Sequence, residues 1–224
     1  MTVRLEYADK IAIIRLGEDE NRFSPAFLDD IDDALNQAVS DGAQGLVTTA
    51  GGKFYSNGLD LEWLGAHTDQ GQWYIGRVHR LLARMLTLPL PTAAAVVGHA
   101  FGAGAMLAVA HDFRVMRADR GYFCFPEVDI RIPFNPGMAA LIQAKLTPRA
   151  AVASMTTGRR FSGAEAEEFG IVDAACPERA VTDTAVDMLR PLHGKDPGTL
   201  GAIKQTMFDH VVRALVDDED GATS

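Results

Sequence analysis

Three segments carry residues whose types and spacing could polarise a carbonyl group and move a proton. They are residues 53–61 (KFYSNGLDL), residues 98–104 (GHAFGAG) and residues 125–130 (FPEVDI). Each of the first two is a glycine-bearing turn toward a helix start, where free backbone N–H groups and the helix dipole favour negative charge. Two such donors aimed at one point would form an oxyanion hole. Glu127, a carboxylate among apolar neighbours, is a candidate base with a raised pKa.

The elements that must position these segments alternate between strands and helices. Residues 3–7 and 11–16 predict a hairpin, and residues 46–49, 92–97 and 113–116 predict further strands. Helix caps and apolar repeats predict the helices. These are expected to begin at Ser24-Pro25, at Thr147-Pro148 and at the capping box Ser162–Glu165, and to cover about 72–86, 105–110, 136–145, 181–192 and 198–216. This alternation indicates an α/β protein with a partly parallel sheet.

Composition excludes several classes of protein. The chain has 224 residues, of which 47% are hydrophobic and 23% charged, as expected for a globular protein with a large core. Subtracting 30 acidic residues from 21 basic ones gives a net charge of −9. Because an acidic surface repels phosphate backbones, we expect no nucleic-acid partner, and an anionic ligand would need a local basic pocket.

Residues 85–110 contain no Asp, Glu, Lys or Arg, so their length alone would allow a membrane span. Two prolines and three glycines interrupt the stretch, and we therefore expect buried core and no membrane contact. Cys124 and Cys176 are too few for a disulfide framework and lack CxxC spacing. With no apolar signal segment at the start and no peroxisomal address in the final DDEDGATS, the expected compartment is the cytoplasm.

The order of these motifs resembles the crotonase (enoyl-CoA hydratase/isomerase) superfamily over roughly residues 3–190. The matching stretches are GKFYSNGLDL, LPLPTAAAVVGHAFGAGAMLAVAHDFRVM, FPEVDIRIP and FSGAEAEEFGIVD. Within the superfamily they are most similar to the monofunctional Δ3,Δ2-enoyl-CoA isomerases. The resemblance implies a spiral core of ββα repeats over residues 1–190, followed by a C-terminal helical extension and acidic tail over residues 191–224.

The resemblance also implies roles for individual residues. The oxyanion hole would use the amides of Leu59 and Ala103, and Glu127 matches the second glutamate of the family's hydratases. Met106 stands where those hydratases carry their first glutamate. Adding water to a double bond needs two proton-transferring groups, whereas shifting a double bond needs only one. The resemblance therefore implies conversion of 3-enoyl-CoA to 2-enoyl-CoA through a dienolate, with coenzyme A as part of the substrate and no other cofactor or metal.

The substrate's remaining contacts are also expected by resemblance. Lys53 and Arg22 are candidates for the CoA phosphates, and the loop at Ser56 and Asn57 for the adenine. The acyl pocket would be lined by apolar residues from several segments: Phe54, Tyr55, Trp63, Ile75, Val78, Met106, Phe125, Ile132 and Phe134. Relatives of this kind suggest a homotrimer or a dimer of trimers.

The same residues also allow other interpretations. The chain could be a hydratase, could perform other acyl-CoA enolate chemistry such as thioester hydrolysis or decarboxylation, or could bind acyl-CoA without catalysis. Glu127 could be a helix-start carboxylate with no chemical role. Asp129 is a nearby alternative base.

Several polar residues near the motifs are expected to be structural. His99 and His111 lack metal-ligand spacing, and Cys124 has no recognisable partner base. Asp60 is expected to cap a helix, and Asp112 and Arg114 are expected to pair with each other. Gly102-Ala-Gly104 begins a dinucleotide-like GxG, but Leu107 stands at the third glycine position.

Overall fold

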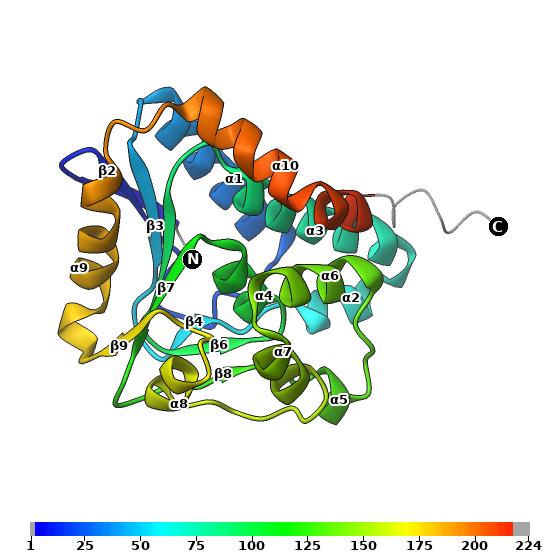
Figure 1. The fold of residues 1–224 in the computed structure, drawn as a ribbon. Helices are drawn as coiled ribbons and strands as arrows, with labels where there is room; N and C mark the ends of the chain where they lie inside the picture. The colour runs from blue at the N-terminus through cyan, green and yellow to red at the C-terminus, as the bar shows by residue number, and fades with distance from the viewer. Residues whose placement is uncertain (1–2, 217–224) are drawn as a thin grey trace.

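Two sheets form the frame of the structure (Figure 1), a computed structural model that describes residues 3–216. The larger sheet has six strands in the order β1-β2-β3-β5-β7-β9, and the smaller has three in the order β4-β6-β8. Among the strands of residues 3–216, β1 and β2 pair in antiparallel fashion as a hairpin, and the other strand pairs are parallel. The strands are β1 Arg4–Ala8, β2 Ile11–Arg15, β3 Gly45–Thr49, β4 Phe54–Ser56, β5 Thr92–Val96, β6 His99–Phe101, β7 Phe113–Arg117, β8 Phe123–Cys124 and β9 Ala174–Cys176.

After the hairpin, consecutive strands belong alternately to the larger and the smaller sheet, and helices follow each pair of strands. β3 is followed by β4, β5 by β6 and β7 by β8, so each pair gives one strand to each sheet before the next helices begin. This is the expected spiral of ββα repeats, and the α/β prediction is confirmed. The sequence pattern did not reveal β4, β6, β8 or β9, which lie in segments expected to be loops and turns.

The helices surround the sheets, and the last of them lies across α3 and α6 (Figure 1). They are α1 Pro25–Ser40, α2 Leu61–Ala66, η1 Thr68–Gln70, α3 Gly71–Thr87, α4 Ala103–Ala110, α5 Glu127–Ile130, α6 Pro136–Lys145, α7 Pro148–Met155, α8 Gly163–Glu168, α9 Glu178–Leu189, η2 Arg190–Leu192 and α10 Pro197–Val216. The expected caps are present at Ser24, Thr147 and Ser162, the last as a full capping box. The predicted acidic tail lies outside the described residues.

Residues 85–110 form the centre of the core. They contain the end of α3, the strands β5 and β6, and α4, in which every residue is buried. Within residues 3–216, no helix is both long enough and apolar enough to cross a membrane. The stretch without charges is therefore interior packing divided between strands and a short helix.

The start of α4 lies directly against the end of β4. A Cβ atom at Gly104 would lie 2.5 Å from the backbone oxygen of Ser56 and 2.7 Å from its Cβ. Ser56 is completely buried, so its backbone cannot move away without disturbing the core. Only glycine at position 104 lets the smaller sheet and this helix approach so closely.

Replacing Gly104 with alanine should therefore destabilise the fold. Because the added methyl group overpacks rigid backbone, we expect Gly104→Ala to lower the free energy of unfolding by about 2 kcal/mol, measured by urea denaturation. Gly65→Ala is the matched control, because a Cβ there meets no atom within 4 Å and the residue lies in α2. The control should be neutral or gain up to ~1 kcal/mol. Equal stability of the two variants would contradict the packing argument.

Candidate active site

The two glycine-bearing turns meet where the parallel strands β4 and β6 end. Phe54 pairs with His99 and Ser56 with Ala100, so the residues after each strand emerge on the same side. Gly58 has φ 78°, and a Cβ at this position would lie 2.9 Å from the Ala103 nitrogen. Leu59, the next residue, therefore lies beside Ala103, as the oxyanion-hole prediction requires.

The amides of Leu59 and Ala103 are available to a ligand. Within the described part of the chain, neither nitrogen donates a hydrogen bond. Ala103 is the first residue of α4, where backbone N–H groups have no partner inside the helix and the helix dipole adds positive character. The junction of the two turns thus presents two unused donors suited to a carbonyl oxygen that gains negative charge.

A short segment before α1 holds the first turn in place. The Asn57 amide donates to the Glu20 oxygen and the Phe23 amide to the Gly58 oxygen, each at 2.8 Å. Asn21, fully buried with φ 50°, donates from Nδ2 to the Tyr55 oxygen at 3.0 Å. Sequence reasoning missed Asn21, since an asparagine in a loop carries no signal of the strand it will support.

Tyr74 of α3 supports the same turn from the other side. Its hydroxyl accepts a hydrogen bond from the Asp60 amide at 2.8 Å, although the residue is fully buried. Asp60 in turn caps α2 by accepting from the Trp63 amide at 3.0 Å, which confirms the predicted cap. Tyr74 was also missed, because its position in an amphipathic helix marks it only as core.

Glu127 lies on the other side of the second turn. It is the first residue of α5, and a Cβ added at Gly102 would lie 3.6 Å from its Oε1 atom. Its Oε2 atom is buried and has no hydrogen-bond partner. Burial raises the pKa of Glu127 to about 7 from an ordinary value of 4.5. This is an unsatisfied carboxyl beside Ala103 that can accept or release a proton near neutral pH.

Asp129, the alternative base, points elsewhere. The segment is a helical turn, and its two carboxyls lie against different loops. A Cβ at Gly158 would lie 3.0 Å from Oδ1 of Asp129, which places this carboxyl against the loop after α7. Glu127 is thus the carboxyl that borders the two turns.

Apolar side chains surround this arrangement. Met106 is 1% exposed and lies one turn into α4, and Phe125 is fully buried with its ring centroid 6.1 Å from that of Phe134. The Ile132 amide donates to the Glu127 oxygen at 3.0 Å, but its side chain is 44% exposed. Trp63 is half-buried near Leu59, with its ring 5.1 Å from that of Tyr74. Two further expected wall residues, Tyr55 and Val78, are completely buried in the core.

Comparison with known proteins places this geometry in context. The family model described as enoyl-CoA hydratase/isomerase matches residues 6–221. The chain belongs to this family. It is 38% identical over 221 residues to enoyl-CoA delta isomerase 3 of Arabidopsis thaliana, covering 92% of each chain. It is 39% identical over 180 residues to the peroxisomal enoyl-CoA delta isomerase 2 of the same plant, covering 75% of this chain and 73% of the relative.

Solved structures of one Mycobacterium tuberculosis protein are also similar. One describes it as a probable enoyl-CoA hydratase, with a TM-score of 0.91, 26% identity, and coverage of 99% of this chain and 94% of that one. The other describes it as an enoyl-CoA isomerase, with a TM-score of 0.90, 25% identity, and coverage of 98% and 96%. The family thus includes proteins described by either activity, and the site residues must distinguish them.

The expected contacts with coenzyme A have unequal structural support. Lys53 lines a polar pocket with His99, Arg120 and Asp119, and the Asp119 carboxylate is paired with Arg117. Burial together with Lys53, Arg120 and Arg160 lowers the pKa of His99. Because the protein has a net charge of −9, an anionic ligand needs a local basic region of this kind.

Arg22 and Ser56 have less structural support as contacts with coenzyme A. Arg22 forms an ion pair with Glu20. Besides Arg22 and Ser24, its pocket is lined by four acidic residues that repel phosphate: Asp19, Glu20, Asp60 and Glu62. The buried Ser56 hydroxyl donates to the Asn21 oxygen at 2.8 Å and accepts from the Gly58 amide at 3.1 Å, so its role is to shape the turn. Asn57 is half-buried beside it.

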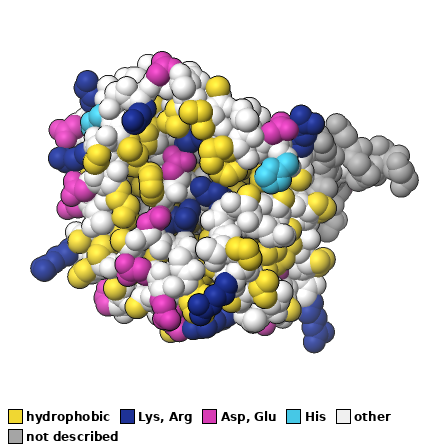
Figure 2. All heavy atoms as spheres, viewed as in Figure 1, with side chains coloured by type: hydrophobic (Ala, Val, Ile, Leu, Met, Phe, Trp, Pro, Cys, Tyr) yellow, Lys and Arg dark blue, Asp and Glu magenta, His cyan; other side chains and the backbone are white. Residues whose placement is uncertain are grey.

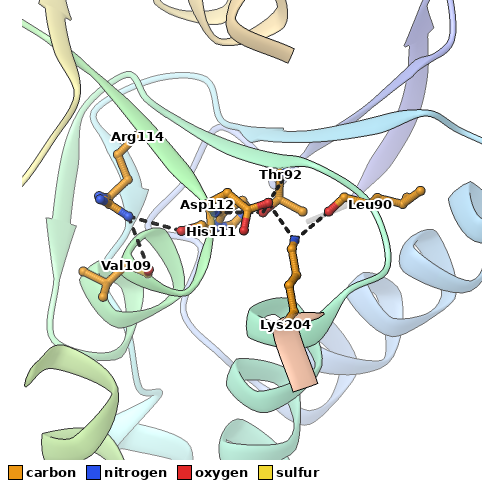
Figure 3. Close-up of polar contacts among 7 residues, drawn as sticks. All are labelled: Leu90, Thr92, Val109, His111, Asp112, Arg114 and Lys204. Carbon is orange, nitrogen blue, oxygen red and sulfur yellow. Dashed lines mark hydrogen bonds and ion pairs between the residues drawn. The ribbon is translucent and has the colours of Figure 1, made fainter. Parts of the chain in front are cut away.

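The expected pairing of Asp112 with Arg114 is wrong. Asp112 instead lies 2.6 Å from Lys204 of α10, while Arg114 donates to the His111 oxygen (Figure 3). Arg114 also donates to the Ile171 oxygen and lies 3.9 Å from Asp173. Asp112 precedes β7 and Arg114 lies within it, and each side chain is held by partners from other segments. The sequence gives no hint of Lys204, because 92 residues separate it from Asp112.

The remaining polar residues are held by structural contacts. His111 bridges Thr48 and the Leu107 oxygen, and His99 accepts from the Tyr122 amide. Burial raises the pKa of the Cys124 thiol to about 11, which makes it a poor nucleophile. Residues 3–216 contain no group of three or more His, Cys, Asp or Glu residues that could hold a metal ion.

The raised pKa of Glu127 predicts a specific pH dependence of stability. Its ionisation is disfavoured in the folded state, so the wild-type free energy of unfolding should fall, relative to Glu127→Gln, as pH rises from about 4.5 to about 7. The difference should reach roughly 2–3 kcal/mol above pH 7. Urea denaturation of both proteins at several pH values measures it. A constant difference across this range would show that Glu127 titrates as an exposed carboxyl.

Proposed function

We propose that this enzyme shifts the double bond of 3-enoyl-CoA thioesters to give 2-enoyl-CoA. The observation that carries the proposal is the Glu127 carboxyl beside the second turn, whose buried Oε2 atom has no hydrogen-bond partner. By the family resemblance, Met106 occupies the position of the second carboxyl of the hydratases. The Arabidopsis relatives named enoyl-CoA delta isomerase support the same activity.

The proposed reaction begins with the substrate's thioester oxygen, which accepts hydrogen bonds from the amides of Leu59 and Ala103. This lowers the pKa of the C2 protons, and the Glu127 carboxylate removes one of them. The electron pair moves into a dienolate whose charge rests on the held oxygen. Glu127, now protonated, returns the proton at C4, and the carbonyl re-forms. The proton count balances within the substrate, so we propose that no metal or redox cofactor takes part.

Hydration is the second function to consider, because the M. tuberculosis protein is also described as a probable enoyl-CoA hydratase. Adding water requires one group to activate the water and another to deliver a proton. The thioether of Met106 does neither, and its side chain is fully packed in α4. The single carboxyl therefore favours the isomerase over the hydratase, and its burial near the amides favours an enzyme over a passive acyl-CoA binder.

Glu127→Gln should reduce kcat at least a hundredfold with little change in KM, because it removes the proton carrier but keeps the shape. The ultraviolet absorbance of the conjugated thioester product reports the rate with a 3-enoyl-CoA substrate. In the wild type, kcat/KM should rise with pH and level off above about 7, because the base acts only when ionised. Asp129→Asn is the matched control and should keep the wild-type rate.

Two results would contradict this assignment. Near-normal turnover by Glu127→Gln would remove Glu127 from the mechanism. Hydration of a 2-enoyl-CoA at a rate comparable with isomerisation would show that another group supplies the second proton transfer.

We also propose that Lys53, and not Arg22, binds a CoA phosphate, because Lys53 lies in a basic pocket and Arg22 among acids. Lys53→Met should raise KM for the CoA substrate about tenfold, which corresponds to loss of ~1.4 kcal/mol, and should leave kcat unchanged. Arg22→Met should leave both constants unchanged. Steady-state kinetics of the two variants tests this, and the reverse pattern would overturn it.

The assembly and compartment are further proposals. We propose a homotrimer or a dimer of trimers, supported by exposed apolar side chains on and after α5 and on α7: Val128, Ile130, Ile132 and Val152. We propose the cytoplasm as the compartment, supported by the two free cysteines, although two of the plant relatives are named as peroxisomal.

A further inference from the structure

A pocket of about 370 Å³ lies away from the candidate active site, between α10 and the ends of the larger sheet where β5 and β7 begin. Its lining comes from the ends of β5, β7 and α6, from η2 and from one side of α10: Pro91, Asp112, Phe113, Lys145, Leu192, Lys195, Leu200, Ile203, Lys204, Met207 and Phe208. Figure 2 shows charged side chains in the hollowed middle of this face, with hydrophobic side chains around them. None of the residues assigned to the reaction lines it.

The acidic group of the pocket is already satisfied. The Asp112 Oδ2 atom lies 2.6 Å from the Lys204 Nζ atom and also accepts from the Thr92 amide at 2.8 Å (Figure 3). Lys204, which is 3% exposed, donates in addition to the Leu90 oxygen at 2.7 Å. Asp112 and Lys204 thus neutralise each other at the floor of the pocket.

Lys145 is left without an anion. It forms no ion pair or hydrogen bond with the described residues, and its ammonium lies 5.3 Å from the centroid of the Phe208 ring. Burial, with Arg114 and Lys204 nearby, lowers the pKa of Lys145 to about 8, against the opposing effect of Asp112 and Asp173. A half-buried cation in an apolar pocket is unfavourable unless an anion joins it.

The geometry points to a second ligand site, in which this pocket binds a monocarboxylate with a medium-length alkyl chain. The carboxylate pairs with the Lys145 ammonium, and the chain lies along Phe113, Leu192 and Met207. The volume is within the range of about 300–1,000 Å³ that small-molecule sites occupy. The half-buried Lys145 supplies the unpaired positive charge inside the pocket, whereas Lys195 is exposed at its rim. The apolar walls match a hydrocarbon chain rather than a sugar or a nucleotide.

Decanoate is the probe for this site, and the methionine methyl groups of the full chain are the reporters. In carbon-13 methyl NMR, decanoate should shift the Met207 signal saturably and leave that of Met106, at the candidate active site, unchanged. Lys145→Met should weaken binding at least tenfold, and decanol should bind at least tenfold more weakly than decanoate. The control Lys10→Met, in the exposed turn between β1 and β2, should bind as the wild type does.

A second variant keeps the test valid if Lys145→Met does not fold. Ile203 is 50% exposed at the mouth of the pocket, so Ile203→Asp should fold and should repel the carboxylate, weakening binding by a similar factor. The inference is overturned if decanoate causes no saturable shift of Met207, if it shifts Met106 alone, or if both variants bind it normally. It is also overturned if sedimentation shows that a second copy of the chain already covers the pocket and dissociates in Lys145→Met.

Discussion

The close contact between two glycine-bearing turns is the constraint on which the rest of the site depends. Gly58 touches the start of α4 at Ala103, and Gly104 touches the end of β4 at Ser56. A side chain at either glycine would separate the turns and with them the two free amides. The short sheet β4-β6-β8 exists to bring these turns together, and the larger sheet supplies the rigid frame that holds it.

The chemistry that we propose for Glu127 depends on the burial of its carboxyl and on the lack of a carboxyl at position 106. Burial removes water from the carboxyl and raises its pKa to about 7, so it is held near its point of protonation at neutral pH. Because Met106 offers no second carboxyl, the proton that Glu127 takes can only go back to the substrate or to solvent. In the mechanism that we propose, this difference favours a proton shuttle over a hydration catalyst.

The sequence predicts the long elements and the motifs well, because their signals are local. The hairpin, the helix caps at Ser24 and Ser162, and the order of the motif segments need only neighbouring residues to be recognised. The strands β4, β6 and β8 have two or three residues each and exist only through pairing with distant segments, so no local pattern marks them. The supports supplied by Asn21 and Tyr74, and the partner of Asp112, are long-range contacts of the same kind. The resemblance to a family located Leu59, Ala103 and Glu127, whereas the structure places the turn at Gly58 against Ala103 and the Glu127 carboxyl near Gly102.

The infrared carbonyl stretch of a bound thioester tests the central claim most directly. A saturated acyl-CoA with carbon-13 at the carbonyl binds the wild-type protein without reacting, so the band reports only the environment of its oxygen. If the amides of Leu59 and Ala103 both hold that oxygen, the band should move to lower frequency than in water. A bound thioester whose band stays at the frequency in water, or moves above it, would contradict the account.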